Sequence, residues 1–530
     1  MSTQEIVQKE LESMPEMCRK LFVRGYVVYS ERPTGKDGFP FYGSWSDTEI
    51  DGYWFRIHPD QHFYYAKHGD VSVCMVGNAL NSFDGKYHET QILPELASRY
   101  AQNRDAFFAY LNELTGCFTL FVIENKRLHW FADASGMLFC AYGMVDGNLY
   151  ISSHPQCLGD ILNLHVSEYA DRLRSYPHFR KYGVFYPGDL TWYDEIRRSL
   201  PNFEYTYDGS TIAKQRFFPI SPQKPCQTEE DYKAVVQQCS NILKSIMKCA
   251  SLKWEDASVS LSGGVDSRVT LAAANGCYDG FDYYSYHTMP GDLPDATAAS
   301  EIARQLGLCH EIYTVPNNNE DFPNYAVHAM IQRHNMGDHH INDNDIRKRI
   351  WFDQNAPVKV EIKSWISEIG RANYYKKFGL RHMPKKLSPR HMTSMYKLFT
   401  TQRRLAKDTD RIFASYIKET CPKGFPTGYD TSDMYLWEFR YGAWGGLVNT
   451  CEQSYAYEIF MPFNNRKLLQ LMLCAPLQKR ISDQLHEDIW LEANPSVGSL
   501  AKPVVNWNET KKRMYMEKAY FLVHSFFRFL

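Results

Sequence analysis

The feature that most constrains the fold is a glycine-rich loop between an expected strand and an expected helix. Residues 257–261 have the pattern of a strand and residues 268–275 that of a helix, and Ser262-Gly263-Gly264-Val265-Asp266-Ser267 joins them. The alternation then continues with a strand, a helix and a strand over 281–288, 297–306 and 310–315. This order and spacing predict a parallel sheet with right-handed crossovers.

The chain before this region has a different pattern. The first 20 or so residues predict an amphipathic helix, and the part from about 22 to 215 is rich in short β-type, aromatic segments. A helix is expected around 91–101, and the Asp146-Gly147 pair is typical of a two-residue hairpin turn. Strands are expected at 71–76, 117–123, 128–132, 138–142 and 149–152. Together they predict an antiparallel, sandwich-like domain with some helix.

A proline-rich stretch divides the chain. Residues 219–225 contain three prolines and predict a linker, after which Thr228 can cap a long helix. We therefore expect two domains, 1–218 and 226–530. The second should combine the parallel sheet with a mostly helical region after about residue 320, so the fold class is α/β.

Composition excludes several functional classes. The formal net charge of -2 gives no reason to expect a nucleic-acid partner. The 13 cysteines are scattered singly, with no metal-ligand spacing, which favours reduced thiols and a cytoplasmic protein. No apolar run is long enough for a membrane span. The apolar end, 521–530, predicts a docked helix rather than a membrane-surface anchor.

The loop itself has the chemistry of a phosphate site. Gly263 and Gly264 let the backbone approach an anion closely, and the N–H groups at the start of the next helix favour negative charge. Ser262 and Ser267 add hydroxyl donors, and Asp266 implies a bridging Mg²⁺. Without the lysine of the usual phosphate loop, the segment suits pyrophosphate as a leaving group. The alternative is a simple Gly-Gly turn with a capping side chain.

These residues resemble the asparagine synthetase-like family of ATP pyrophosphatases, which includes β-lactam synthetases and lasso-peptide cyclases. The resemblance implies a PP-loop domain of the adenine nucleotide alpha-hydrolase type and an ATP site at Leu261 to Ser267 with Mg²⁺. Further matches follow the family's second helix and a segment near the C-terminus: Asp295, Ala298, Ile302, Ala303, Leu306, Gly307, His310, Arg440, Glu458, Pro462, Phe463 and Asn465.

The N-terminal half is more weakly similar to the family's glutaminase domain, an Ntn-hydrolase-like sandwich. Residues 114–118, Asp133 and Gly136 carry this similarity. Such glutaminases use an N-terminal cysteine, but this chain has Ser2 on an expected helix. The resemblance therefore implies a degenerate domain without glutamine hydrolysis.

The family's second phosphate segment is also altered, and its best counterpart is residues 363–371. By this match, Glu368 is a second Mg²⁺ ligand and Arg371 meets phosphate or a substrate carboxylate. An amphipathic helix with solvated charges explains the same residues. Phe460 replaces an arginine of the family's later segment.

Other candidates are less specific. Tyr286 and His287 end a strand where a nucleotide base would lie, although strand-end burial explains them equally. By resemblance Lys502 lies near the reacting acyl phosphate, with a surface lysine as the alternative. Glu452 and Glu458 are possible bases or helix-face salt bridges. The His334 to Asp345 region fits no zinc pattern and predicts a solvated loop.

The expected function is that of an ATP-dependent, AMP- and pyrophosphate-forming amide ligase with no glutaminase of its own. Its catalytic candidates are Glu368, Arg371, Lys502 and Glu458, and its metal ligands Asp266 and Glu368. The partners would be a small-molecule, sugar or peptide carboxylate and an amine donor, with a homodimer possible. A cyclising synthetase, a glutamine- or ammonia-dependent amidotransferase and a non-catalytic ATP-binding homologue remain alternatives.

Overall fold

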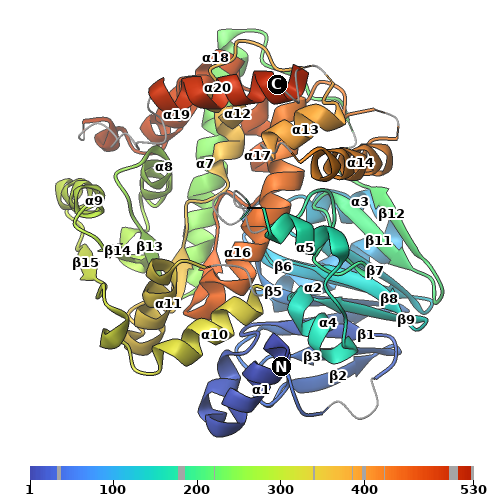
Figure 1. The fold of residues 1–530 in the computed structure, drawn as a ribbon. Coiled ribbons are helices and arrows are strands. Elements are labelled where there is room, and N and C mark those ends of the chain that lie inside the picture. Colours follow the sequence, from blue (N-terminus) through green and yellow to red (C-terminus); the bar gives the residue numbers. More distant parts are fainter. Residues whose placement is uncertain are drawn as a thin grey trace.

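The computed structural model describes residues 1–32, 37–176, 179, 185–219, 221–337, 341–384, 386–396, 402–422, 424–499 and 511–526. Antiparallel sheets form its N-terminal part, and a parallel sheet with many helices forms the rest (Figure 1). The α/β class and the order of the two parts agree with the sequence prediction.

Two six-stranded antiparallel sheets make up the N-terminal part. The first has the order β10 (Ile196–Arg198), β8 (Ala141–Val145), β9 (Asn148–Ser152), β1 (Tyr26–Tyr29), β3 (Tyr53–Ile57), β2 (Ser46–Ile50). The second has the order β12 (Ile212–Arg216), β11 (Phe203–Tyr207), β7 (Arg127–Ala132), β6 (Leu114–Glu124), β5 (Val71–Asn81), β4 (Phe63–His68).

Aromatic side chains join the two sheets face to face. Phe121 of β6 meets Phe55 of β3 with ring centroids 5.4 Å apart, and Trp130 of β7 meets Tyr142 of β8 at the same separation. Helix α2 (Glu89–Gln102), followed by α3 (Arg104–Leu111), contacts β4 and β5, while α4 (Pro155–Leu162), followed by α5 (Glu168–Arg174), contacts β8 and β9. The predicted sandwich is confirmed, with helices on its outer faces.

The strand expected at 138–142 begins later, at Ala141. Asp133 explains the difference, because its buried carboxylate accepts hydrogen bonds from the backbone N–H groups of Ser135, Met137 and Leu138 at 2.9–3.1 Å. N–H groups held by a side chain in this way are not available to a sheet ladder.

The N-terminal helix α1 (Thr3–Ser13) and the turn η1 (Pro15–Lys20) pack against α10 (Tyr325–Asn335) of the C-terminal part. Ser2 caps α1, since its hydroxyl accepts from the Glu5 N–H and its own N–H donates to the Glu5 carboxylate. This reciprocal pair is a capping box, which gives Ser2 a structural role at the start of the helix.

Five parallel strands form the second part, in the order β15 (Glu311–Thr314), β14 (Asp282–His287), β13 (Ala257–Ser260), β16 (Val360–Ile362), β17 (Glu458–Phe460). The chain moves outward from β13 to β14 and β15, then returns to add β16 and β17 on the other side of β13. The border between β13 and β16 is therefore a topological switch point, where loops separate at the carboxyl ends of the strands.

Helices make up the rest of the described second part. The long α7 (Glu229–Lys253) begins at the Thr228 cap, as predicted, and packs against α8 (Val265–Ala273) and α19 (Gln484–Ala493). The others are α9 (Leu293–Gln305), α11 (Asp343–Asn355), α12 (Asn373–Phe378), α13 (Pro389–Met395), α14 (Arg403–Thr420), α15 (Thr431–Met434), the π-helical η5 (Tyr435–Gly445), α16 (Gly446–Cys451), α17 (Arg466–Cys474), α18 (Leu477–Ile481) and α20 (Lys511–Phe526).

The C-terminal helix α20 docks on α12 and α13, where Phe521 stacks on Phe378 at 4.6 Å. The docked helix expected here is confirmed as far as it is described, since residues 527–530 lie outside the described part. Among the described residues, no helix is long and apolar enough to cross a membrane. All 13 cysteines lie in the described part and are free.

Buried polar side chains form hydrogen bonds and an ion pair between the two parts. Asn464 donates to the Asp133 carboxylate at 2.8 Å, and Arg466 donates to the carbonyl oxygens of Ala132 and Asp133. Arg216 forms an ion pair with Glu438. These contacts cross the domain boundary that the sequence placed at 218–226.

Buried neutral histidines should make the protein less stable in acid. Burial lowers the pKa of His328 to about 4, so the unfolded chain binds a proton between pH 6.5 and 4 that the folded chain does not. Stability should therefore fall as the pH drops through this window, by about 2 kcal/mol at pH 5 for this residue. Urea unfolding of the native chain and of His328→Gln at several pH values measures the effect.

The variant should show a flatter dependence between pH 6.5 and 4, because it lacks this titrating group. His68→Gln is the control, since His68 is exposed. Equal pH slopes for the native chain and His328→Gln would contradict the assignment.

Candidate functional site

The glycine-rich loop lies at the switch point. Leu261 still pairs with β14, because its N–H donates to the Tyr284 carbonyl at 2.8 Å. Residues 262–264 then turn the chain into α8, which begins at Val265 rather than at the expected 268. Gly264 is the N-cap, and no described side chain caps this helix. An uncapped helix start at the carboxyl edge of a parallel sheet is a favourable place for an anion.

Within the loop, the serine hydroxyls bond to each other. Ser262 Oγ and Ser267 Oγ are 2.8 Å apart, and the Gly264 N–H donates to Ser262 Oγ at 3.3 Å. The Gly263 N–H donates to Asp295 Oδ1 of α9 at 3.0 Å, and burial raises the pKa of that carboxyl. The loop therefore already binds one anionic oxygen through its backbone, in the manner expected for phosphate.

The segment after β16 meets α8 directly. Ser364 Oγ donates to Thr270 Oγ1 at 2.8 Å, Ser367 donates to Asp266, and Arg371 Nη1 donates to Asp266 Oδ2 at 2.9 Å. Asp266 and Thr270 are four residues apart and so share one face of α8. Residues 367–371 form a short 3-10 helix, η4 (Ser367–Arg371), and Glu368 and Arg371 are not solvated as an exposed helix face would require.

Glu368 is the second carboxylate of the crevice. Tyr441 of η5 donates its hydroxyl to Glu368 Oε2. Burial raises the pKa of Glu368, and the negative charge of Asp266 raises it further. A divalent cation bound between the two carboxylates would offset their mutual repulsion beside the uncapped helix start.

These residues fit Mg²⁺ held jointly with phosphates. The described residues contain no group of three or more His, Cys, Asp or Glu side chains arranged to hold a metal. Mg²⁺ bound with a nucleotide commonly uses only one or two carboxylates and takes its other ligands from phosphate and water. Asp266 and Glu368 supply that number.

Helix α19 adds two residues that the sequence patterns did not identify. Asp483 accepts from Arg371 Nε at 2.7 Å and from Nη2 at 3.1 Å, so the guanidinium lies between Asp483 and Asp266. His486 is fully buried, with Nε2 3.8 Å from Asp266 Oδ1. Neither ring nitrogen has a hydrogen-bond partner among the described residues, and burial lowers the pKa of His486 to about 4.

One of the predicted catalytic residues, Glu458, is not part of this cluster. Glu458 is the first residue of β17, at the amino end of the strand, and its carboxylate accepts from Asn78 at 2.7 Å and lies 3.2 Å from His62 Nε2. Because the loop lies at the opposite, carboxyl end of the sheet, we correct the prediction and place Glu458 outside the site. Lys502 lies outside the described residues.

The predicted adenine-contacting residues end β14, beside the loop. The Tyr286 hydroxyl accepts from Lys348 of α11 at 2.9 Å, and His287 Nε2 is 3.0 Å from Thr314 Oγ1 of β15. The His287 carbonyl accepts from the Val315 N–H. Both side chains are thus turned to neighbouring elements, while the strand end itself borders β13.

A second, charge-balanced cluster lies near these residues. Lys363, which follows β16, donates to Gln453 Oε1 at 2.8 Å and is 3.6 Å from Glu361. Arg349 donates to Glu452 at 3.0 Å. The salt-bridge explanation therefore accounts for Glu452, which the sequence also allowed as a base.

Comparison with known proteins does not assign a family. No protein-family model matches the chain, and no curated protein matches it. A solved structure titled as the allosteric regulatory enzyme of purine biosynthesis is similar, with 11% identity over 49% of this chain and 58% of its own length, at a TM-score of 0.24. A glutamine phosphoribosylpyrophosphate amidotransferase from B. subtilis, complexed with ADP and GMP, is also similar. Its identity is 12% over 53% of this chain and 62% of its own length, at a TM-score of 0.21.

The chain thus spans about three fifths of the length of these two proteins. The TM-scores and identities are too low to carry their fold or activity over to it. The function proposed below rests on the geometry of the crevice between β13 and β16.

Proposed function

We propose that the chain binds ATP with Mg²⁺ at this crevice, transfers the adenylyl group to a substrate carboxylate with release of pyrophosphate, and joins the activated carboxylate to an amine. The observation that supports the proposal most is the convergence of Asp266, Glu368 and Arg371 on an uncapped helix start at a topological switch point. These residues come from two segments about 100 positions apart in the sequence, which only the sheet order brings together.

Each group has a role that follows from its place. When pyrophosphate binds, the backbone N–H groups of Gly263 and Gly264 exchange their present acceptors, Asp295 Oδ1 and Ser262 Oγ, for pyrophosphate oxygens. The dipole of α8 favours the charge of these oxygens. Arg371, held by Asp483, stabilises the negative charge that develops on the leaving group. Asp266 and Glu368 hold Mg²⁺, which neutralises phosphate charge when it is bound. His486 remains neutral, so it adds no charge to the cluster.

The acceptor is a carboxylate of a small molecule, sugar or peptide, and the nucleophile is an amine. The Ser2 hydroxyl caps α1. It therefore does not take the place of a glutaminase nucleophile, which agrees with an enzyme that has no glutaminase of its own. A cyclising reaction would join both groups within one molecule. Product analysis separates these cases, because a cyclising enzyme forms AMP from a single organic substrate without added amine.

Calorimetry with ATP and with pyrophosphate, each with and without Mg²⁺, tests the proposal. The native chain should bind both with Mg²⁺, and fractions of cell extract that contain its substrates should yield AMP and pyrophosphate. Formation of ADP instead of AMP would overturn the reaction class. Absence of ATP and pyrophosphate binding at millimolar concentration would overturn the site.

Gly264→Ala should weaken pyrophosphate binding while preserving the fold. A Cβ at this position would meet Ser262 Oγ at 3.2 Å, and its backbone does not need positive φ, so the turn itself tolerates alanine. The added methyl group would, however, occupy the space through which phosphate reaches the backbone. We expect roughly tenfold to 100-fold weaker binding in calorimetry, which corresponds to about 1.4–2.7 kcal/mol.

Gly291→Ala is the matched control, because nothing lies within 4 Å of a Cβ built there and its φ is ordinary. Both variants should unfold at nearly the same temperature as the native chain. Unchanged pyrophosphate affinity in Gly264→Ala would argue against close backbone contact with the anion.

A further inference from the structure

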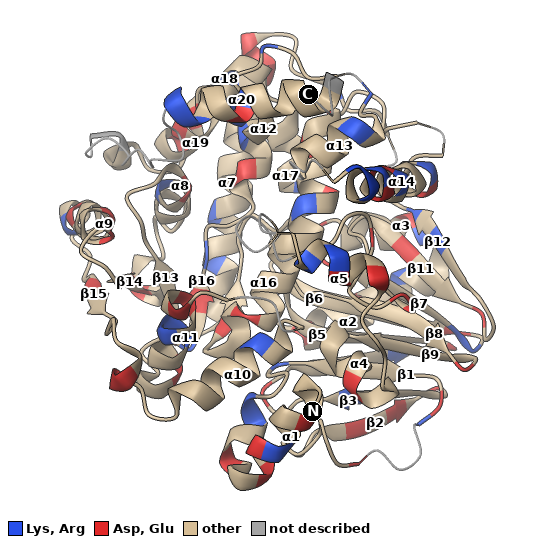
Figure 2. Ribbon diagram, viewed as in Figure 1, with Lys and Arg blue, Asp and Glu red and all other residues tan. Residues whose placement is uncertain are grey.

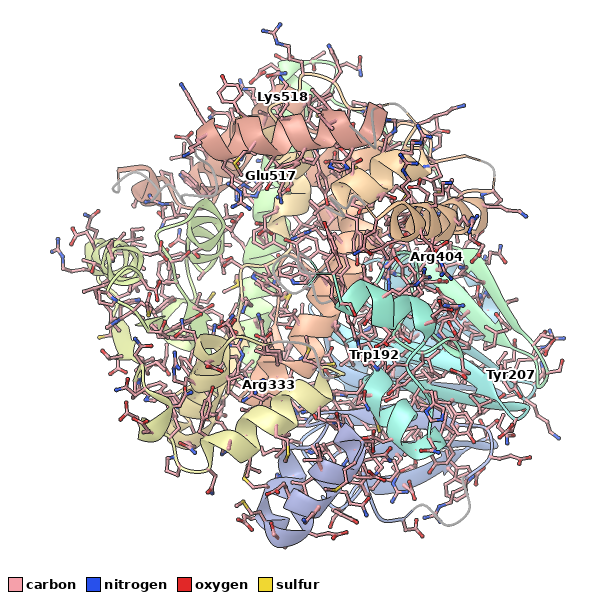
Figure 3. The ribbon with its side chains drawn as sticks, in the orientation of Figure 1. Trp192, Tyr207, Arg333, Arg404, Glu517 and Lys518 are labelled. Atoms are coloured by element: carbon pink, nitrogen blue, oxygen red, sulfur yellow. The ribbon has the colours of Figure 1, made fainter. Side chains whose placement is uncertain are left out.

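A basic groove lies between α5 and α14, away from the crevice of the proposed function. It encloses about 720 Å³ and opens to the surface. Figure 2 shows Lys and Arg on both helices, and Arg404 is labelled on α14 in Figure 3. The side chains that line the groove include six basic and two acidic ones, so its lining carries a net positive charge. The basic ones are Arg172, Arg197, Arg403, Arg404, Lys407 and Arg411.

Three elements supply these charges. Arg172 comes from α5 and Arg197 from β10, while the other four lie on the N-terminal half of α14. No described side chain caps α14, so the positive end of its dipole adds to the field. Asp408 pairs with Arg172 and with Arg411, each at 3.0 Å. Glu168 of α5 pairs with Arg404 at 3.1 Å and lies 3.8 Å from Arg172 Nε. Asp408, Asp194 and Glu168 together still leave an excess of positive charge over the six basic side chains.

Three guanidinium nitrogens of the lining arginines lack hydrogen-bond partners. They are Arg197 Nη1, Arg172 Nη1 and Arg172 Nε, all of them buried and none with a hydrogen-bond partner among the described residues. Because these nitrogens have almost no accessible surface, an anion in the groove would reach them only after a neighbouring side chain moved. Such an anion would instead meet the exposed basic side chains of α14, which are Arg403, Arg404, Lys407 and Arg411.

We propose that this groove binds a small anion that carries more than one phosphate charge. Guanidinium forks match phosphate oxygens in pairs, and several forks from three elements can surround a multiply charged group. The volume falls within the usual size range of small-molecule sites. The side chains of Tyr169, Leu190 and Ile412 give the groove an apolar wall, suited to the organic part of such a ligand.

The site shares no residue with the crevice around Asp266, and the proposal does not depend on ATP chemistry there. Of its basic residues, Lys407 and Arg411 are exposed, so changing them leaves the core intact. Lys418 is also exposed, lies on the same helix three turns further on, and does not line the groove. It is therefore a matched control for a change of charge on α14.

Calorimetry with inorganic tripolyphosphate tests the proposal, with EDTA present and in the Gly264→Ala background, so that Mg²⁺-dependent binding at the crevice does not contribute. We expect Lys407→Glu with Arg411→Glu to weaken tripolyphosphate binding at least tenfold. Lys418→Glu should change it less than twofold. Circular dichroism confirms that each variant is folded.

Citrate, with three carboxylates, is the second probe. Tripolyphosphate should bind at least tenfold more tightly than citrate, and equal affinities would overturn the assignment to phosphate. Undetectable tripolyphosphate binding at millimolar concentration, or equal losses in the groove variant and Lys418→Glu, would overturn the site. None of these outcomes bears on ATP binding, which is measured separately with Mg²⁺.

Discussion

Asp266→Asn should lower the rate of pyrophosphate release from ATP roughly 100-fold or more, because metal-assisted charge stabilisation contributes several kcal/mol to such a transition state. Asparagine keeps the size of the side chain and one oxygen acceptor. It removes the negative charge that balances Arg371 and that we propose as a ligand of Mg²⁺. The change therefore affects the electrostatics of the crevice more than its shape.

The measurement is the release of pyrophosphate by the native chain and the variant with the same substrate fraction. Asp279→Asn is the control, since Asp279 is exposed on a short turn before β14. Thermal unfolding should show that Asp266→Asn remains folded. Activity within threefold of the native chain would exclude Asp266 as a metal ligand.

Glu368 gives this site an expected pH dependence. Its pKa is raised by burial and by the charge of Asp266, so its carboxylate form is lost at a higher pH than that of an ordinary glutamate. If this carboxylate binds Mg²⁺, activity should fall on the acid side as Glu368 becomes protonated. Glu368→Gln should remove most activity at every pH, whereas a Glu368→Gln enzyme with native activity would show that Asp266 alone is sufficient.

The sequence predicted the first three strands of the parallel sheet because each is bounded by clear helix and turn signals. Strands β16 and β17 were missed, since each has only three residues and lies in a mostly helical stretch. A charged residue within such a short strand also hides its pattern, as Glu361 does in β16. These two strands nevertheless create the switch point that gives the loop its neighbours.

The site shows the same division. Asp266 follows a strand that the sequence predicted, whereas Glu368 and Arg371 follow β16, which was missed. Only the family resemblance placed these two residues beside Asp266. Asp483, His486 and Tyr441 reach the crevice through the packing of α19 and η5, which no local pattern specifies. Glu458 was misplaced for a related reason. The segment resemblance identified Glu458 but specified neither its strand nor the end of the sheet at which it lies.

A buried ion pair between the two parts of the chain gives the second large expected effect. Lys253, at the end of α7, donates to both carboxylate oxygens of Glu89 at 2.7 and 2.8 Å, and their side chains are only 6% and 3% exposed. The ammonium also donates to the carbonyl oxygens of Tyr87 and Ala79 at 3.0 and 3.3 Å. The Ala79 N–H donates to Glu89 Oε1. The Lys253 ammonium and the Glu89 carboxylate therefore both have several hydrogen-bond partners inside the protein.

Lys253→Met should destabilise the protein by about 3–5 kcal/mol, because it leaves the Glu89 carboxylate buried without its counter-ion. Urea unfolding measures this loss. Lys359→Met is the matched control, since Lys359 pairs with Asp256 at 2.6 Å but their side chains are 69% and 63% exposed. Exposed pairs contribute about 0–1 kcal/mol, so the control should change little.

The double variant Lys253→Met/Glu89→Gln separates the cost of an unpaired charge from the loss of contacts. Glutamine keeps an oxygen that can accept from the Ala79 N–H but carries no charge, so the double variant should be more stable than Lys253→Met alone. That order of stabilities would mean that the pair acts mainly by offsetting the free-energy cost of burying each charge at the boundary between the two parts. If Lys253→Met costs no more than Lys359→Met, the pair is not a constraint, and the polar contacts around Asp133 and Asn464 hold the boundary without it.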